Sequence, residues 1–82
     1  MSNHFITALK KTRKALNKSQ EQVAEKLGLS RSAYTYYELG YTKPTCEFII
    51  NVSKAMNVDY CLFMNEILKD MIEDGHLEGL SK

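Results

Sequence analysis

Side chains able to recognise a DNA base lie close together between residues 31 and 39. In a helix, which turns about 100° per residue, five of them share one side. Short donors and acceptors with one arginine are the groups that recognise base edges in the major groove. A polar helix side can equally be a solvated surface, so both interpretations remain open at this point. The side chains concerned are Arg31, Ser32, Thr35, Tyr36 and Leu39.

Two short helices joined by a tight turn are predicted to position these groups. Ser19 is a good N-cap for a helix over 20–27, and a glutamine three residues later completes a capping box. Gly28 can end that helix in the left-handed conformation, and Ser30 caps the second helix, over 31–39. Two helices flanking a three- or four-residue turn that begins with glycine are typical of the helix-turn-helix motif.

The tyrosines of this region divide between the interior and the surface. Tyr34 and Tyr37 fall on the side of the 31–39 helix opposite the polar groups, so we expect them in the core. Only Tyr36 and Tyr41 then remain outside, which is too few for a platform that stacks single-stranded bases. The sequence therefore favours double-stranded DNA over a single strand.

The same residues resemble a known family. The chain is similar to the Xre family, the phage repressor and Cro-like class of helix-turn-helix proteins, over about residues 9–64. This resemblance implies a compact, all-α, five-helix domain of the lambda-repressor type that binds palindromic operators as a dimer, with its third helix in the major groove. The segments that carry it are QEQVAEKLGLSRSAY at 20–34, YELG at 37–40, KP at 43–44 and AMNVD at 55–59.

Carried over by position, the resemblance assigns DNA contacts to nine residues. Gln20 would contact phosphate or brace the third helix. The bases would be faced by Arg31, Ser32, Thr35 and Tyr36, and the DNA backbone would be contacted by Thr42 and Lys43 from the following loop. The chain departs from the family pattern at Asn57, at Ser53 and, most importantly, at Tyr36, which could contact a base, contact a phosphate or only pack. The nine residues are Gln20, Ser30, Arg31, Ser32, Thr35, Tyr36, Tyr41, Thr42 and Lys43.

Arg13 is predicted to form an internal ion pair. It falls on the apolar side of the first helix, four residues after Leu9 and three before Leu16, where a charge needs a partner. Glu38 lies at the edge of the inward side of the 31–39 helix and can supply one. The resemblance implies the same pairing, so we assign Arg13 and Glu38 to structure before DNA contact.

The helix expected over 59–74 carries more apolar side chains than one core can absorb. We expect it to form a homodimer whose twofold symmetry places two recognition helices about 34 Å apart, one turn of DNA. In the alternative, the helix folds back over its own core. The predicted interface residues are Tyr60, Phe63, Met64, Ile67, Leu68 and Met71.

Charge is unevenly distributed although the net charge is only +1. Residues 1–43 hold eight Lys or Arg and three Glu, a balance of +5, whereas residues 44–82 hold three basic and seven acidic residues, a balance of −4. A positive face on a nearly neutral molecule suits phosphate contact, because the local field attracts the duplex. A solvated lysine-rich surface would give the same pattern.

Several other classes of protein fit poorly. No segment has the length of a membrane span and the start lacks a signal sequence, so we expect a cytoplasmic protein with no membrane contact. Cys46 and Cys61 have no partners at metal-ligand spacing, so we expect reduced apolar fillers and no metal. His4 and His76 lie near the ends, and we expect no enzyme activity, cofactor or small-molecule ligand.

The sequence thus predicts a helix-turn-helix DNA-binding domain over 1–74, with the motif at 20–39, followed by a flexible tail at 75–82. The expected function is a sequence-specific transcriptional regulator that acts as a repressor. The alternative is a protein-interaction module, such as an antitoxin or adaptor, in which DNA binding is secondary.

Overall fold

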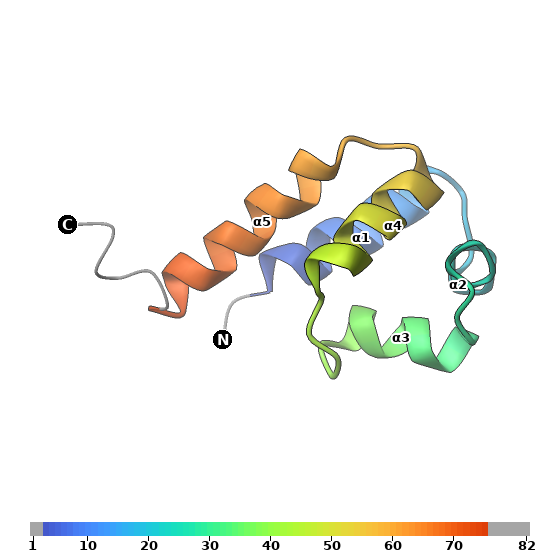
Figure 1. Cartoon of the computed structure of the whole chain (residues 1–82), viewed down its shortest axis with the longest axis horizontal. Coiled ribbons are helices and arrows are strands. Elements are labelled where there is room, and N and C mark those ends of the chain that lie inside the picture. The colour runs from blue at the N-terminus through green and yellow to red at the C-terminus, as the bar shows by residue number, and fades with distance from the viewer. Residues whose placement is uncertain (1–2, 76–82) are drawn as a thin grey trace.

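The structure, a computed structural model, describes residues 3–75, and over that range the chain forms five helices and no strand. The expected all-α, five-helix architecture is confirmed. α1 packs against α5 and α3, and α4 packs against α2 and α5, so α2 and α3 form a corner beside the other three helices (Figure 1). The helices are α1 (His4–Ala15), α2 (Gln20–Leu27), α3 (Arg31–Leu39), α4 (Cys46–Met56) and α5 (Tyr60–Glu73).

Side-chain caps begin four of the helices, and those of α2 and α3 are at the residues predicted above. Ser19, Ser30 and Thr45 each accept a hydrogen bond from the backbone N–H three residues later, and Asp59 accepts one from Cys61. Asn57 ends α4 in the left-handed conformation, with φ of 57°, a position where asparagine is found in place of the commoner glycine. Local sequence therefore sets most of the helix boundaries.

The N-terminus of α1 is capped from a distant helix instead. The side chain of Asn3 makes no capping bond, and Asp70 of α5 accepts from His4 N at 2.7 Å and from Phe5 N at 3.0 Å. The His4 ring also contacts the Glu73 carboxylate. These contacts attach the start of α1 to the last two turns of α5, and no local signal in the sequence predicts them.

The core lies between the helices and includes Phe63, which the sequence analysis placed at the dimer interface. Phe63 is expected at a dimer interface, but it is fully buried and its ring meets that of Phe5 edge-on, with centroids 5.8 Å apart. The reason is that Phe63 lies where α5 crosses α1 and α4, so its own protomer covers it. The buried apolar residues are Phe5, Leu9, Val23, Ala24, Tyr34, Phe48, Ile49, Val52, Met56 and Phe63.

Three other residues are more exposed than the sequence suggests. Cys46 and Cys61 are free but exposed, so the prediction that they fill the core is wrong. Both lie in the first turn of a helix, off the buried side, and the Asp59 carboxylate raises the pKa of the Cys61 thiol. Leu16 is also exposed, because α1 ends at Ala15 and the chain turns away there.

The last expectations from the sequence concern the C-terminal tail, membrane-spanning helices and metal sites. Asp74 follows the end of α5, and Gly75 has a left-handed φ of 83°. The other residues of the predicted flexible tail, 76–82, lie outside the described residues. Within residues 3–75, no helix is long and apolar enough to cross a membrane, and no group of histidine, cysteine or acidic side chains could hold a metal ion.

Candidate nucleic-acid interface

The turn between α2 and α3 has the geometry expected of a helix-turn-helix motif. Gly28 is left-handed, with φ of 71°, and Leu29 N donates to Ala24 O at 2.9 Å. Ala24 is buried where the two helices meet, and Leu29 packs against the core. This turn fixes the angle at which α3 leaves α2 and directs one side of α3 away from the protein.

The outward side of α3, which we call the reading face, consists of Arg31, Ser32, Thr35 and Tyr36. Arg31, Ser32 and Tyr36 are exposed, and Thr35 is half-buried. Together with Gln20 these side chains line one shallow hollow of about 240 Å³. The structure therefore brings five of the nine predicted DNA-contacting residues together on one accessible surface.

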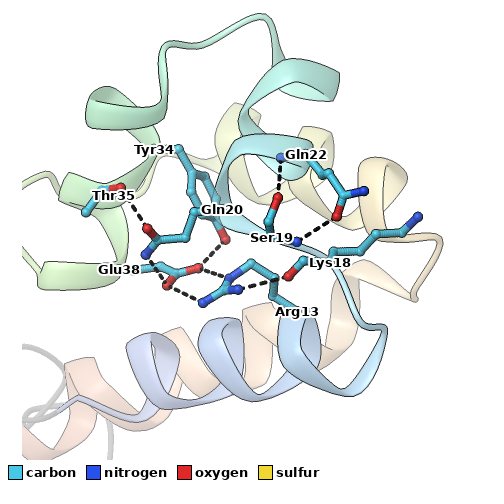
Figure 2. A network of polar contacts seen from close by, with 8 residues as sticks. All are labelled: Arg13, Lys18, Ser19, Gln20, Gln22, Tyr34, Thr35 and Glu38. Atoms are coloured by element: carbon cyan, nitrogen blue, oxygen red, sulfur yellow. Dashed lines mark hydrogen bonds and ion pairs between the residues drawn. The ribbon is translucent and has the colours of Figure 1, made fainter.

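Gln20 holds the reading face against α2. Its side-chain oxygen accepts a hydrogen bond from the Thr35 hydroxyl at 3.2 Å, and its amide nitrogen donates to Glu38 Oε1 at 3.0 Å (Figure 2). The sequence left Gln20 either contacting phosphate or bracing α3, and the structure shows the bracing contacts. Ser30 is likewise engaged, because its hydroxyl accepts from Ala33 N at 3.1 Å as the cap of α3.

A buried ion pair lies directly behind this face, as Figure 2 shows. Arg13 donates to Glu38 through Nε at 2.7 Å and through a second guanidinium nitrogen at 3.2 Å, and it also donates to Lys18 O at 2.9 Å. The Tyr34 hydroxyl donates to the same carboxylate at 2.6 Å. The Glu38 carboxylate thus joins α1, α2 and α3 at one point.

The ionisation of this cluster follows from its contacts. Burial alone would raise the pKa of Glu38, but hydrogen bonds from Arg13, Tyr34 and Gln20 outweigh it and lower the pKa below the ordinary 4.5. The hydrogen bond to Glu38 raises the pKa of Arg13 despite its burial. Burial, followed by the bond to Glu38, raises the pKa of Tyr34. Both members of the ion pair therefore stay charged at neutral pH.

The loop after α3 presents the other three predicted residues beside the reading face. Tyr41 and Lys43 are exposed, and Thr42 is half-buried. Tyr41 N and Thr42 N donate to Tyr36 O at 2.9 and 3.3 Å, which fixes the start of the loop on the last turn of α3. The loop turns at left-handed Gly40, with φ of 83°, close to Ile6 of α1.

One feature of the site, the contact made by the Tyr34 hydroxyl, was not predicted from the sequence. The Tyr34 hydroxyl belongs to the ion-pair cluster, although the sequence predicts only an apolar core role; a buried tyrosine ordinarily needs a hydrogen-bond partner, and this was the available signal. Leu39, at the end of α3, is 54% exposed. This exposure agrees with the outward side of α3, on which helical periodicity places Leu39.

The outer side of α5 carries the exposed part of the predicted dimer surface. Two of the predicted residues, Tyr60 and Leu68, are exposed, as is Ile72, which was not among them. We call these three residues the α5 stripe. At 100° per residue they fall within about a third of the helix circumference. Met64 and Met71 fall within the same arc and Ile67 lies at its edge, and all three are half-buried. Five of the six predicted interface residues are thus at least partly accessible, Phe63 being the exception.

Comparison with known proteins places the chain in a family. The family model described as helix-turn-helix matches residues 9–63, which include α2, α3 and the turn between them. No solved structure gives a significant match.

Three curated bacterial proteins are similar in sequence. The uncharacterised HTH-type transcriptional regulator YqaE of Bacillus subtilis (strain 168) is 45% identical over 60 residues, which cover 71% of this chain and 52% of YqaE. The cryptic phage CTXphi transcriptional repressor RstR of Vibrio cholerae is 39% identical over 46 residues, 56% of this chain and 41% of RstR. The uncharacterised regulator YobD of Bacillus subtilis is 31% identical over 76 residues, 90% of this chain and 68% of YobD.

The matches cover only part of each of the first two relatives, but they are sufficient to assign the family. The matches cover about half of YqaE and about two fifths of RstR, so they concern only part of those proteins. The matched segments agree with the helix-turn-helix geometry of α2 and α3, and the family is one of transcriptional regulators, not an enzyme class. The chain belongs to the Xre-like helix-turn-helix family of DNA-binding transcriptional regulators.

Proposed function

We propose that this chain is a transcriptional repressor that binds a palindromic operator as a homodimer, with α3 in the major groove of each half-site. The observation that carries the proposal is the reading face, whose four side chains are accessible while the Arg13–Glu38 pair and Gln20 hold α3 from behind. A preorganised set of donors and acceptors loses little entropy when it contacts base edges. The similarity to RstR, a phage transcriptional repressor, supports the choice of repression.

The contacts divide into two kinds by position. Arg31, Ser32 and Thr35 lie on the side of α3 that would enter the groove, so they would carry sequence discrimination. Lys43, from the loop, and the start of α2 at Gln20 flank that side and would contact phosphates, to which the N-terminal dipole of α2 adds. Glu21 lies in the first turn of α2 and weakens this attraction in part.

The homodimer is proposed from the α5 stripe. Tyr60, Leu68 and Ile72 expose large apolar side chains along one side of a helix, on a domain too small to tolerate much exposed apolar area. A twofold contact through this stripe would add the reading face of a second protomer. It would place the two reading faces about one turn of DNA apart. A different protein could occupy the same stripe, which is the antitoxin or adaptor alternative, and the state of the free chain in solution separates the two.

A selection on random duplex DNA, followed by titration of the recovered site, tests the DNA-binding proposal. We expect a site with twofold symmetry, bound about 10³-fold or more tightly than random duplex at the same salt concentration. Arg31→Ala should lower affinity for that site about 10-fold or more. Lys11→Ala is the matched control, because Lys11 is an exposed cation of α1 near Leu62 and Glu66, away from α3.

The outcomes are separable. A folded chain that enriches no duplex would contradict the proposed function. Equal losses for Arg31→Ala and Lys11→Ala would show that only general charge is being read, which would also contradict it.

A further inference from the structure

The outward side of α3 has two chemically different ends. Its first turn carries the charged and polar groups Arg31 and Ser32, with Thr35 following. The opposite end, which we call the aromatic end, consists of Tyr36, Leu39 and Tyr41. These three side chains are 48%, 54% and 76% exposed. The core does not need them there, since Tyr34 and Tyr37 already cover the inner side of α3.

The aromatic end is held in shape by the chain itself. The rings of Tyr36 and Tyr41 lie against each other, with centroids 5.9 Å apart and planes tilted by 48°. The hydrogen bonds from Tyr41 N and Thr42 N to Tyr36 O fix the two backbones relative to each other. Leu39 lies three residues after Tyr36 and is therefore its neighbour on the helix surface. Such a surface is formed before any ligand arrives, so little conformational entropy is lost on binding.

The chemistry of the major groove identifies what this surface fits. Each base pair presents hydrogen-bonding groups there, and the one apolar group among them is the C5-methyl of thymine. An apolar side chain placed against a cytosine amino group or a guanine oxygen would remove water without replacing its hydrogen bond. Placed against a thymine methyl, it buries apolar area on both sides.

We propose that the aromatic end selects thymine at the half-site positions it faces, by contact of Tyr36 and Leu39 with the C5-methyl group. Tyr41 is a positioning residue that holds the Tyr36 ring. The polar end reads the adjacent base pairs through hydrogen bonds. This inference rests on the proposed function, since it needs α3 in the major groove, and it adds the kind of base that one end of α3 recognises.

Replacement of single thymines by deoxyuridine tests the inference, because it removes the methyl group and leaves base pairing unchanged. Starting from a selected duplex, each thymine is replaced in turn and affinity is measured at fixed salt by fluorescence anisotropy. We expect one or two positions per half-site at which the loss is about fourfold, the effect of burying one methyl group. Restoring a methyl as 5-methylcytosine in a cytosine-substituted site should recover part of the affinity.

Variants of the chain assign the effect to its residues. In Tyr36→Ala and Leu39→Ala, replacing the assigned thymine by deoxyuridine should no longer lower the affinity. In Tyr36→Phe the same replacement should still lower it. Tyr41→Ala should reduce the penalty, and Lys11→Ala, away from α3, is the control that should retain it. Circular dichroism melting of each variant shows that it is folded.

Each result has one meaning. Failure to recover any specific duplex contradicts the proposed function. A specific duplex with no deoxyuridine-sensitive position overturns the thymine inference alone. A penalty that persists unchanged in both Tyr36→Ala and Leu39→Ala also overturns it, as does a penalty lost in Tyr36→Phe, which would show that the hydroxyl and not the ring makes the contact.

Discussion

The reading face on α3 and the stripe on α5 differ in how far one protomer completes them. Behind the reading face, Glu38 has four hydrogen bonds from three side chains, and among the described residues every buried side-chain nitrogen or oxygen has a partner. The α5 stripe has apolar side chains that its own core does not cover. A completed site needs only its ligand, whereas an incomplete surface points to a second chain. The following experiments test this contrast, from the largest expected effect to the smallest.

Removal of the charge behind the reading face should have the largest effect on stability. Arg13→Ala leaves the Glu38 carboxylate buried without its main partner, and we expect a loss of about 3–5 kcal/mol in the free energy of unfolding. Lys14→Ala, the exposed neighbour on the same helix, should change it by about 0.5 kcal/mol or less. Urea denaturation measures both. Equal free energies of unfolding for Arg13→Ala and the parent chain would show that the Arg13–Glu38 ion pair does not stabilise the fold.

A charge placed in the α5 stripe should act on association and not on folding. Leu68→Asp is expected to weaken the proposed homodimer about 100-fold, because it places an unpaired carboxylate in an apolar contact. Leu62→Asp is a close control, since Leu62 is 42% exposed and Leu68 44%, but Leu62 faces another side of α5. Sedimentation equilibrium at tens of micromolar reports the change. A parent chain that is monomeric there, or equal losses in both variants, would remove the stripe as the dimer surface.

The contact that joins α5 to the start of α1 should have a smaller effect. Asp70→Ala removes the carboxylate that caps α1 at His4 N and Phe5 N, and we expect a loss of about 1 kcal/mol in unfolding free energy. Asn65→Ala, exposed on the same helix, serves as the control. An unchanged value for Asp70→Ala would mean that water replaces this cap at no cost.

Acid should gradually reduce the stability that the buried Arg13–Glu38 ion pair contributes. Because the pKa of Glu38 is lower in the folded chain than its ordinary 4.5, the folded state holds fewer protons and is favoured at higher pH. That contribution is fully present above about pH 4.5 and is lost as the pH falls through the folded-state pKa. Glu38→Gln should therefore show a shallower loss of stability below pH 4.5 than the parent chain. Parallel curves in urea titrations would contradict this assignment.

The fold and the reading face were predictable because their signals are local. Ser19, Ser30 and Thr45 cap helices within three residues of themselves, and Gly28 and Gly40 end helices through their own conformation. The outward side of α3 follows from helical periodicity once its boundaries are known. The pairing of Arg13 with Glu38 was also accessible, since a charge on an apolar side needs a partner.

The parts that escaped depend on contacts between distant segments. Asp70 caps α1 from 66 positions away, and the wide apolar arc of α5 could not show that α1 and α4 would cover Phe63 while Leu68 stayed outside. The exposure of Cys46 and Cys61 has the same origin, because composition says that cysteines are often buried but only packing says which helix side is covered. The side of a helix on which a residue lies follows from the nearby sequence. Whether that side is buried depends on segments that are distant in the sequence.

Base-by-base discrimination by Arg31→Ala tests the central claim most directly. Affinities of the parent chain, Arg31→Ala and Lys43→Ala are measured for a selected operator and for all its single-base-pair variants. If α3 lies in the major groove, Arg31→Ala should lose discrimination at one position of each half-site and keep it elsewhere, whereas Lys43→Ala should weaken binding to all sequences about equally. A uniform loss for Arg31→Ala, with the preference at every position unchanged, would show that the reading face does not read bases.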